Sequence, residues 1–243
     1  MISLLLTACG KKGALIYPDM LVPAPPASFR AMQTGDNIKI SFGIPDKDRA
    51  GRKVKDIAGV KIFKLESPSG QSPACRDCTG YTLFKTFYSE IPGDVQRYGS
   101  LAVMLDGNVV QGRGYTYKVV AFTKEGVNGE AAVPQHVTMQ QFSQPPVLKI
   151  IPTPTELRLE FTGVVSPGNM LMGYNLYRKH KGDVWPYLPL NARPLTEKVF
   201  TDTGLDRRVR YVYVVKSLVR LSNNQIVESS PSNEEEGILK DED

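Results

Sequence analysis

Cys75 and Cys78 form the one local motif of this chain whose residue types and spacing could do chemistry. A Cys-x-x-Cys pair can be a redox site, half of a zinc site or a short disulfide. A redox site needs the first cysteine at a helix N-terminus, where the pKa of its thiol falls, and a zinc site needs further ligands. Prolines and glycines throughout residues 68–80 predict a loop and no helix.

The remaining candidate ligands do not gather in the sequence. His136 and His180 fall in separate predicted domains, so a shared site would need an unusual contact between domains. Asp46 and Asp48 are separated by a lysine, and the basic residues that follow up to Lys55 repel a cation. The sequence contains no nucleophile elbow and no phosphate-binding glycine loop. We therefore expect no metal, no cofactor and no enzymatic activity.

The third cysteine, Cys9, follows a short apolar stretch. Leu6-Thr7-Ala8-Cys9 has the pattern of a lipobox, in which small residues give a peptidase access to the backbone and the thiol accepts a diacylglyceryl group. The apolar part is shorter than that of an ordinary secretory signal, and no lysine or arginine precedes it. We interpret residues 1–8 as a truncated signal peptide with the true start codon upstream, and we expect lipidation at Cys9.

A lipid anchor at Cys9 would place the chain in an oxidising envelope compartment. Paired thiols are normally bridged there, and acylation of Cys9 leaves Cys75 and Cys78 as an even pair. We therefore predict a structural disulfide between Cys75 and Cys78. A bound metal, a redox site and free thiols are the alternatives.

Residues 9–26 are expected to form a lipidated, proline-rich tether. Four prolines favour an extended, partly polyproline II conformation over a packed core. The run Cys-Gly-Lys-Lys-Gly from Cys9 resembles the attachment segment of small Gram-negative outer-membrane lipoproteins, with Ala14 where that family has proline. One such lipoprotein assists assembly of the lipopolysaccharide translocon. The resemblance implies a lipid anchor, and the glycine after Cys9 implies sorting to the outer membrane.

The rest of the chain repeats the same pattern of segments twice. Some segments alternate apolar and polar residues with period two, which predicts strands with one buried face. The other segments match their counterparts in the second copy position by position. The pairs are 37–42 with 156–161, 59–64 with 173–178, and 115–121 with 211–217. A repeat of one β-domain is the simplest account.

The second copy resembles a fibronectin type III domain. Residues 173–178 match the third-strand signature of the family, 200–205 match the exit of its fifth strand, and 228–232 close the last strand in the usual way. Tyr211 is in the position of the tyrosine corner, a hydroxyl that ties a crossover back to the backbone, and Tyr115 is its counterpart in the first copy. The second-strand tryptophan of the family is absent.

The resemblance implies an all-β fold with two tandem fibronectin type III sandwiches, immunoglobulin-like in architecture, after the tether. The predicted first sandwich, 27–141, is the weaker match and carries loop insertions at 46–55 and 66–80. The second sandwich is 146–233. A short, proline-bearing join predicts that the sandwiches sit end to end. The acidic residues 234–243 are expected to be a disordered tail.

Charge and hydropathy limit the function further. Six acidic residues against one lysine give the last ten residues a charge of −5, so the net charge of +5 leaves +10 on the rest. The basic residues are spread along strands without interleaved aromatics, so we expect no nucleic-acid partner. No apolar run after residue 8 approaches the roughly 18 residues of a spanning helix.

We therefore predict a non-enzymatic lipoprotein of the outer membrane, facing the periplasm or the exterior. It would bind a protein or glycan or serve as a structural spacer. The alternative is an accessory factor in outer-membrane or lipopolysaccharide translocon assembly, or a thiol-active envelope helper.

Overall fold

The computed structural model describes residues 17–68, 78–141 and 144–241. Within these ranges the chain is all-β, as the alternation of the sequence predicts. It forms three sheets and one short 3-10 helix, η1 (Pro18–Met20), and no α-helix. No helix in the same ranges is long and apolar enough to cross a membrane. Cys9 and Cys75 lie outside the described residues.

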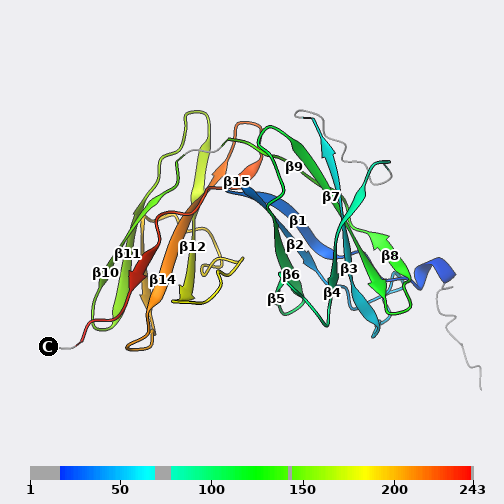
Figure 1. Ribbon diagram of the computed structural model, residues 1–243, viewed down its shortest axis with the longest axis horizontal. Coiled ribbons are helices and arrows are strands. Elements are labelled where there is room, and N and C mark those ends of the chain that lie inside the picture. Colours follow the sequence, from blue (N-terminus) through cyan, green and yellow to red (C-terminus); the bar gives the residue numbers. More distant parts are fainter. Residues whose placement is uncertain (1–16, 69–77, 142–143, 242–243) are drawn as a thin grey trace, which may run out of the picture.

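The N-terminal half has two layers of strands around a hydrophobic core (Figure 1). One layer holds β1 (Ala27–Thr34), β2 (Asn37–Gly43), β6 (Leu101–Asp106) and β5 (Gln96–Tyr98). The other holds β4 (Thr82–Tyr88), β3 (Ile57–Ser67), β7 (Gly114–Thr123), β8 (Asn128–Ala131) and β9 (Gln135–Thr138). Ile38, Ile40 and Phe42 point inward from β2 and are completely buried, because successive side chains of a strand face opposite sides.

The C-terminal half repeats this arrangement around a second hydrophobic cluster. One layer holds β10 (Val147–Pro152), β11 (Glu156–Thr162) and β13 (Val199–Thr203). The other holds β12 (Met170–His180), β14 (Tyr211–Arg220), β15 (Ile226–Glu228) and β16 (Glu235–Gly237). Leu157, Leu159 and Phe161 alternate inward along β11, and the ring of Phe161 meets Tyr174 edge to face at 4.9 Å between centroids.

A single eight-stranded sheet joins the two halves. Strands β15 and β1 pair in parallel with Thr34 opposite Glu228, so the layers of the two halves are continuous. Gly35 follows β1 with φ at 58°, a left-handed conformation that favours glycine, and its N–H donates to the carbonyl of Glu228 at 2.9 Å. The halves therefore meet at an angle through paired strands (Figure 1), and the expected end-to-end arrangement is wrong.

In the part of the predicted tether that the structure describes, residues 18–26 do not extend freely from the body. Residues 18–26 lie against the N-terminal half and hydrogen-bond the loop at residues 47–50. Pro23 is buried, and its carbonyl accepts the N–H of Glu130 at 3.2 Å. Gly129 allows this approach, because a Cβ there would lie 2.3 Å from the Pro23 oxygen. Prolines lack the backbone N–H donor but keep the carbonyl acceptor. The inserted loop at residues 47–50 supplies N–H donors to carbonyls of residues 18–26.

The acidic C-terminus is also more ordered than predicted. Within residues 234–243, strand β16 pairs antiparallel with β14, and Leu239 is buried in the C-terminal cluster. Glu236 forms ion pairs with Lys181 and Arg210. Neighbouring basic residues therefore balance the charge of Glu236, and Leu239 enters the hydrophobic core. The composition of the segment reveals neither contact.

Candidate functional site

The carboxylate of Glu228 lies at the centre of the junction between the halves. The residue is completely buried, and four side chains donate hydrogen bonds to its two oxygens. Thr34 Oγ1 (2.8 Å) and Lys39 Nζ (2.9 Å) come from the N-terminal half, and Tyr177 OH (2.7 Å) and Asn175 Nδ2 (2.5 Å) come from the C-terminal half. We call these five residues the junction hub. Its buried polar groups satisfy one another only while the halves stay together.

The hub contains an ionised carboxylate at neutral pH. Burial by itself raises the pKa of Glu228, but the charges of Lys39 and Lys216 and hydrogen bonds from Lys39 and Asn175 outweigh burial and lower that pKa from 4.5 to about 2. Burial and the Glu228 charge raise the pKa of Tyr177, so its hydroxyl remains a donor.

Lys216 on β14 adds a second ammonium group beside the hub. Its Nζ donates to Thr34 Oγ1 at 2.8 Å and lies 5.1 Å from the centroid of the Tyr177 ring. Burial lowers the pKa of Lys216, against the opposing attraction of Glu228. Lys39 forms an ion pair with Glu228, whereas Lys216 forms none with the residues that the structure describes. The junction thus holds two ammonium groups for one buried carboxylate.

Further contacts fix the angle between the halves. Gln96 of β5 contacts the loop between β12 and β13 twice: its Nε2 donates to the carbonyl of Trp185 at 2.7 Å, and its Oε1 accepts the N–H of Tyr187 at 2.8 Å. At another place, Gln225 Nε2 donates to the carbonyl of Thr138 at 2.8 Å, and its Oε1 accepts the Thr138 N–H at 3.3 Å. The halves are therefore joined at three separate points: the junction hub, the loop between β12 and β13, and the turn between β14 and β15.

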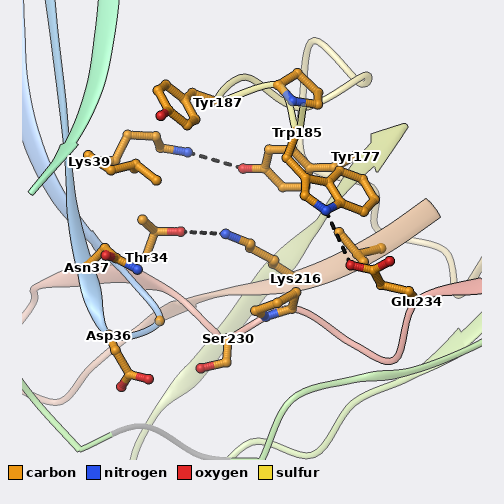
Figure 2. Close-up of a pocket in the computed structure, with 15 residues that line it drawn as sticks. Thr34, Asp36, Asn37, Lys39, Tyr177, Trp185, Tyr187, Lys216, Ser230 and Glu234 are labelled. Atoms are coloured by element: carbon orange, nitrogen blue, oxygen red, sulfur yellow. Dashed lines mark hydrogen bonds between the residues drawn. The ribbon is translucent and has the colours of Figure 1, made fainter. Parts of the chain in front are cut away.

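A cavity of about 250 Å³ opens beside the hub, and residues of both halves line it (Figure 2). We call it the junction pocket and define it by six lining residues. These are Lys39, Tyr177, Trp185, Tyr187, Lys216 and Glu234. Trp185 is held from two sides, because its Nε1–H donates to Glu234 Oε1 at 3.3 Å and the Lys179 ammonium lies 4.7 Å from its ring centroid.

The chemistry of this lining suits binding. Ammonium groups donate hydrogen bonds to an anionic or hydroxylated ligand, and aromatic rings cover its apolar parts, which is the usual division of labour in a small-molecule pocket. In the part of the chain that the structure describes, no group of three histidine, cysteine, aspartate or glutamate residues could hold a metal ion.

The predicted tyrosine corners have matching geometry in the two halves. The hydroxyl of Tyr115 accepts the backbone N–H of Val110 at 2.8 Å, and the hydroxyl of Tyr211 accepts that of Asp206 at 3.0 Å. Each tyrosine lies five positions after its donor and is buried. Both hydroxyls therefore satisfy a backbone donor at the loop that enters β7 or β14.

Sequence reasoning missed a second repeated feature. In each half a buried aspartate accepts a hydrogen bond from the tyrosine eleven positions later. The same aspartate forms an ion pair with a basic residue, which is the last residue of the matched segments 59–64 and 173–178. The residues are Asp106, Tyr117 and Lys64 in the N-terminal half, and Asp202, Tyr213 and Arg178 in the C-terminal half. The shared spacing of aspartate and tyrosine was the available signal.

The other predicted residues lie apart from the pocket. Cys78 is partly buried at the end of the segment that follows β3, and because Cys75 is outside the described residues, the disulfide stays a prediction. His136 on β9 hydrogen-bonds Thr116, and burial lowers the pKa of its imidazole. His180 ends β12, so the structure does not bring the two histidines together.

The pocket residues were also missed from sequence. Trp185 lies between predicted strands, and Lys39 and Lys216 occupy polar positions of predicted strands, where a lysine is normally solvated. The available signals were an acidic residue, Glu228, directly after two apolar residues in a closing strand, and the single tryptophan in a loop.

Comparisons with known proteins add similarity to solved structures alone. No family model matches the chain, and no curated protein matches it in sequence. Among solved structures, it is similar to the FN1–FN3 domains of chicken CNTN1, with a TM-score of 0.33 and 13% identity over 90% of this chain and 68% of that chain. Neither a fold nor a function follows from a similarity at this TM-score.

Proposed function

We propose that this chain is a non-enzymatic, lipid-anchored envelope protein whose two halves, each a fibronectin type III-like sandwich, act together as one binding unit for a protein or glycan. The observation that carries the proposal is the junction pocket. Its walls come from both halves, and hydrogen bonds on several sides hold those halves at a fixed angle. A preformed pocket binds at lower entropic cost than a flexible one.

The docked N-terminal segment supports the anchoring part of the proposal. Because residues 18–26 lie on the body, only residues 9–17 would separate an acyl group on Cys9 from it. Nine residues reach at most about 30 Å when fully extended. The N-terminal half would then lie near the membrane, and Figure 1 shows that η1 is at the end of the molecule remote from the junction. The junction pocket would be held away from the lipid surface.

Site-specific cross-linking tests the binding function. We would place a photoreactive phenylalanine at position 187, on the wall of the junction pocket, and as a control at position 88, an exposed tyrosine on β4 of the other layer. Irradiation in envelope of the source bacterium should capture a protein or glycan at position 187 and not at 88. Capture of translocon or assembly components would favour the accessory role. Equal capture at both positions would contradict a binding role for the pocket.

A further inference from the structure

The Lys216 ammonium has N–H donors that no group among the described residues accepts. An ammonium carries three N–H donors, and the one hydrogen bond that it makes among the described residues goes to Thr34 Oγ1. Glu228, the carboxylate beside it, already accepts four hydrogen bonds and pairs with Lys39. At the hub, two ammonium groups therefore face one carboxylate, and the Lys216 ammonium, which has no ion-pair partner among the described residues, presents N–H groups that can meet an acceptor in the pocket.

The balance of charge favours a carboxylate over a phosphate. One surplus ammonium matches a single negative charge, whereas phosphate recognition usually relies on arginine forks or several donors. Asp36 and Glu234 line the same pocket near the solvent and would repel a second negative charge. The same two carboxylates, with Asn37 and Ser230, are acceptors for hydroxyl groups.

The aromatic residues define the rest of the ligand. Figure 2 shows Lys39 and Thr34 on one side, Trp185 and Tyr177 on the other, and Lys216 reaching between them. Trp185 is fixed by Glu234 and Lys179, so its indole is a prearranged surface for the apolar face of a ring. A volume of about 250 Å³ accommodates one sugar residue and is smaller than the pockets of drug-sized ligands.

We propose that the junction pocket binds an acidic sugar, with Lys216 holding its carboxylate, Trp185 stacking on its ring, and the rim accepting its hydroxyl groups. This inference rests on the proposed binding function and names the ligand class of the same pocket. It assigns Lys216, and no other basic residue, as the group that distinguishes an acidic sugar from a neutral one.

Titration of the full chain with simple sugars tests this assignment. Sodium glucuronate and glucose differ by the carboxylate, and calorimetry or ligand-observed NMR should show glucuronate binding at least tenfold more tightly. Lys216→Met should abolish that preference. The matched control is Lys61→Met, because the Lys61 ammonium also donates to a neutral side chain at 2.8 Å and lies 5.1 Å from an aromatic centroid, but at β3, outside the pocket. The control should bind as the parent does.

A second variant keeps the test independent of the hub. Trp185→Ala removes the stacking surface from a loop without touching Glu228, and should weaken glucuronate binding at least tenfold, even if Lys216→Met were to disturb folding. Equal affinity for glucose and glucuronate, or parental binding by Trp185→Ala or by folded Lys216→Met, would overturn the assignment. If acetate bound as tightly as glucuronate, the sugar ring would contribute nothing and the acidic-sugar assignment would be wrong. A preference for peptides with a free C-terminal carboxylate would also overturn it.

The outcomes also separate this inference from the function on which it rests. Capture of a ligand at position 187 without glucuronate binding would refute the acidic sugar and leave the binding function standing. No capture and no sugar binding would refute both.

Discussion

Replacing Glu228 with glutamine removes the charge at the centre of the junction while keeping the shape of the side chain. Four donors surround the carboxylate, so the new amide would place an N–H₂ group where an acceptor is required. Lys39 and Lys216 would also lose their shared counter-charge. A buried charge without its partner is much more costly than an exposed one.

The pKa of Glu228 sets the expected size of the effect. Its fall from 4.5 to about 2, at about 1.4 kcal/mol per pKa unit, corresponds to roughly 3 kcal/mol of folding free energy from the ionised carboxylate. Because the folded pKa lies below the unfolded one, this contribution is complete above about pH 4.5 and is lost as the pH falls toward 2. Glu228→Gln should therefore be about 3 kcal/mol less stable at pH 7, and the difference should vanish in acid.

Urea unfolding of the parent and Glu228→Gln at several pH values between 7 and 2 measures this difference. Glu66→Gln is the control, because it removes an exposed ion pair with Arg113 and should cost less than about 1 kcal/mol. Loss of the hub should also separate the unfolding of the two halves into two transitions. A difference below about 1 kcal/mol at pH 7, or one that does not change with pH, would refute the reasoning about the hub.

The remaining predictions concern the corners and the cysteines. Tyr211→Phe removes the hydroxyl that accepts the Asp206 N–H and should lower the free energy of unfolding by about 1 kcal/mol; no loss in a thermal melt would contradict the corner. Expressed behind a complete lipoprotein signal peptide, the parent should fractionate with membranes and Cys9→Ser should become soluble or stay unprocessed, whereas identical partitioning would refute the anchor. Alkylation of non-reduced, periplasm-expressed protein should leave Cys75 and Cys78 unlabelled, and labelling of both would refute the disulfide.

Much of the fold could be predicted because its signals are local. Period-two alternation located β2 and β11 almost to the residue, and the buried Ile38, Ile40 and Leu159 are the residues that the pattern turned inward. In a strand with one buried face, apolar and polar residues alternate, so the sequence itself shows which side chains point inward. The same holds for Tyr115 and Tyr211, whose partners lie five positions away.

The errors at both ends of the body share one cause. Prolines predicted a free tether and acidic residues predicted a disordered tail, yet Pro23 is covered by the N-terminal half and Leu239 by the C-terminal half. Composition reports what a segment can do alone. It does not report a neighbouring edge, such as β14 beside β16, that offers hydrogen bonds and apolar surface.

The junction was beyond local reasoning for a stronger reason. Thr34 and Glu228 are 194 positions apart and meet through a parallel pairing that nothing in either strand specifies. Lys39 and Lys216 occupy positions where alternation predicts solvent, and a lysine on an outer face is normally solvated. Those outer faces of the two halves instead turn toward each other, so residues that look like surface in each repeat become the buried hub and the pocket. A site of this kind arises from the angle between the repeats, so the two copies need not carry the same residues there. Glu228 lies in the last strand of the second copy, and it has Lys39 as a partner only because β15 pairs with β1.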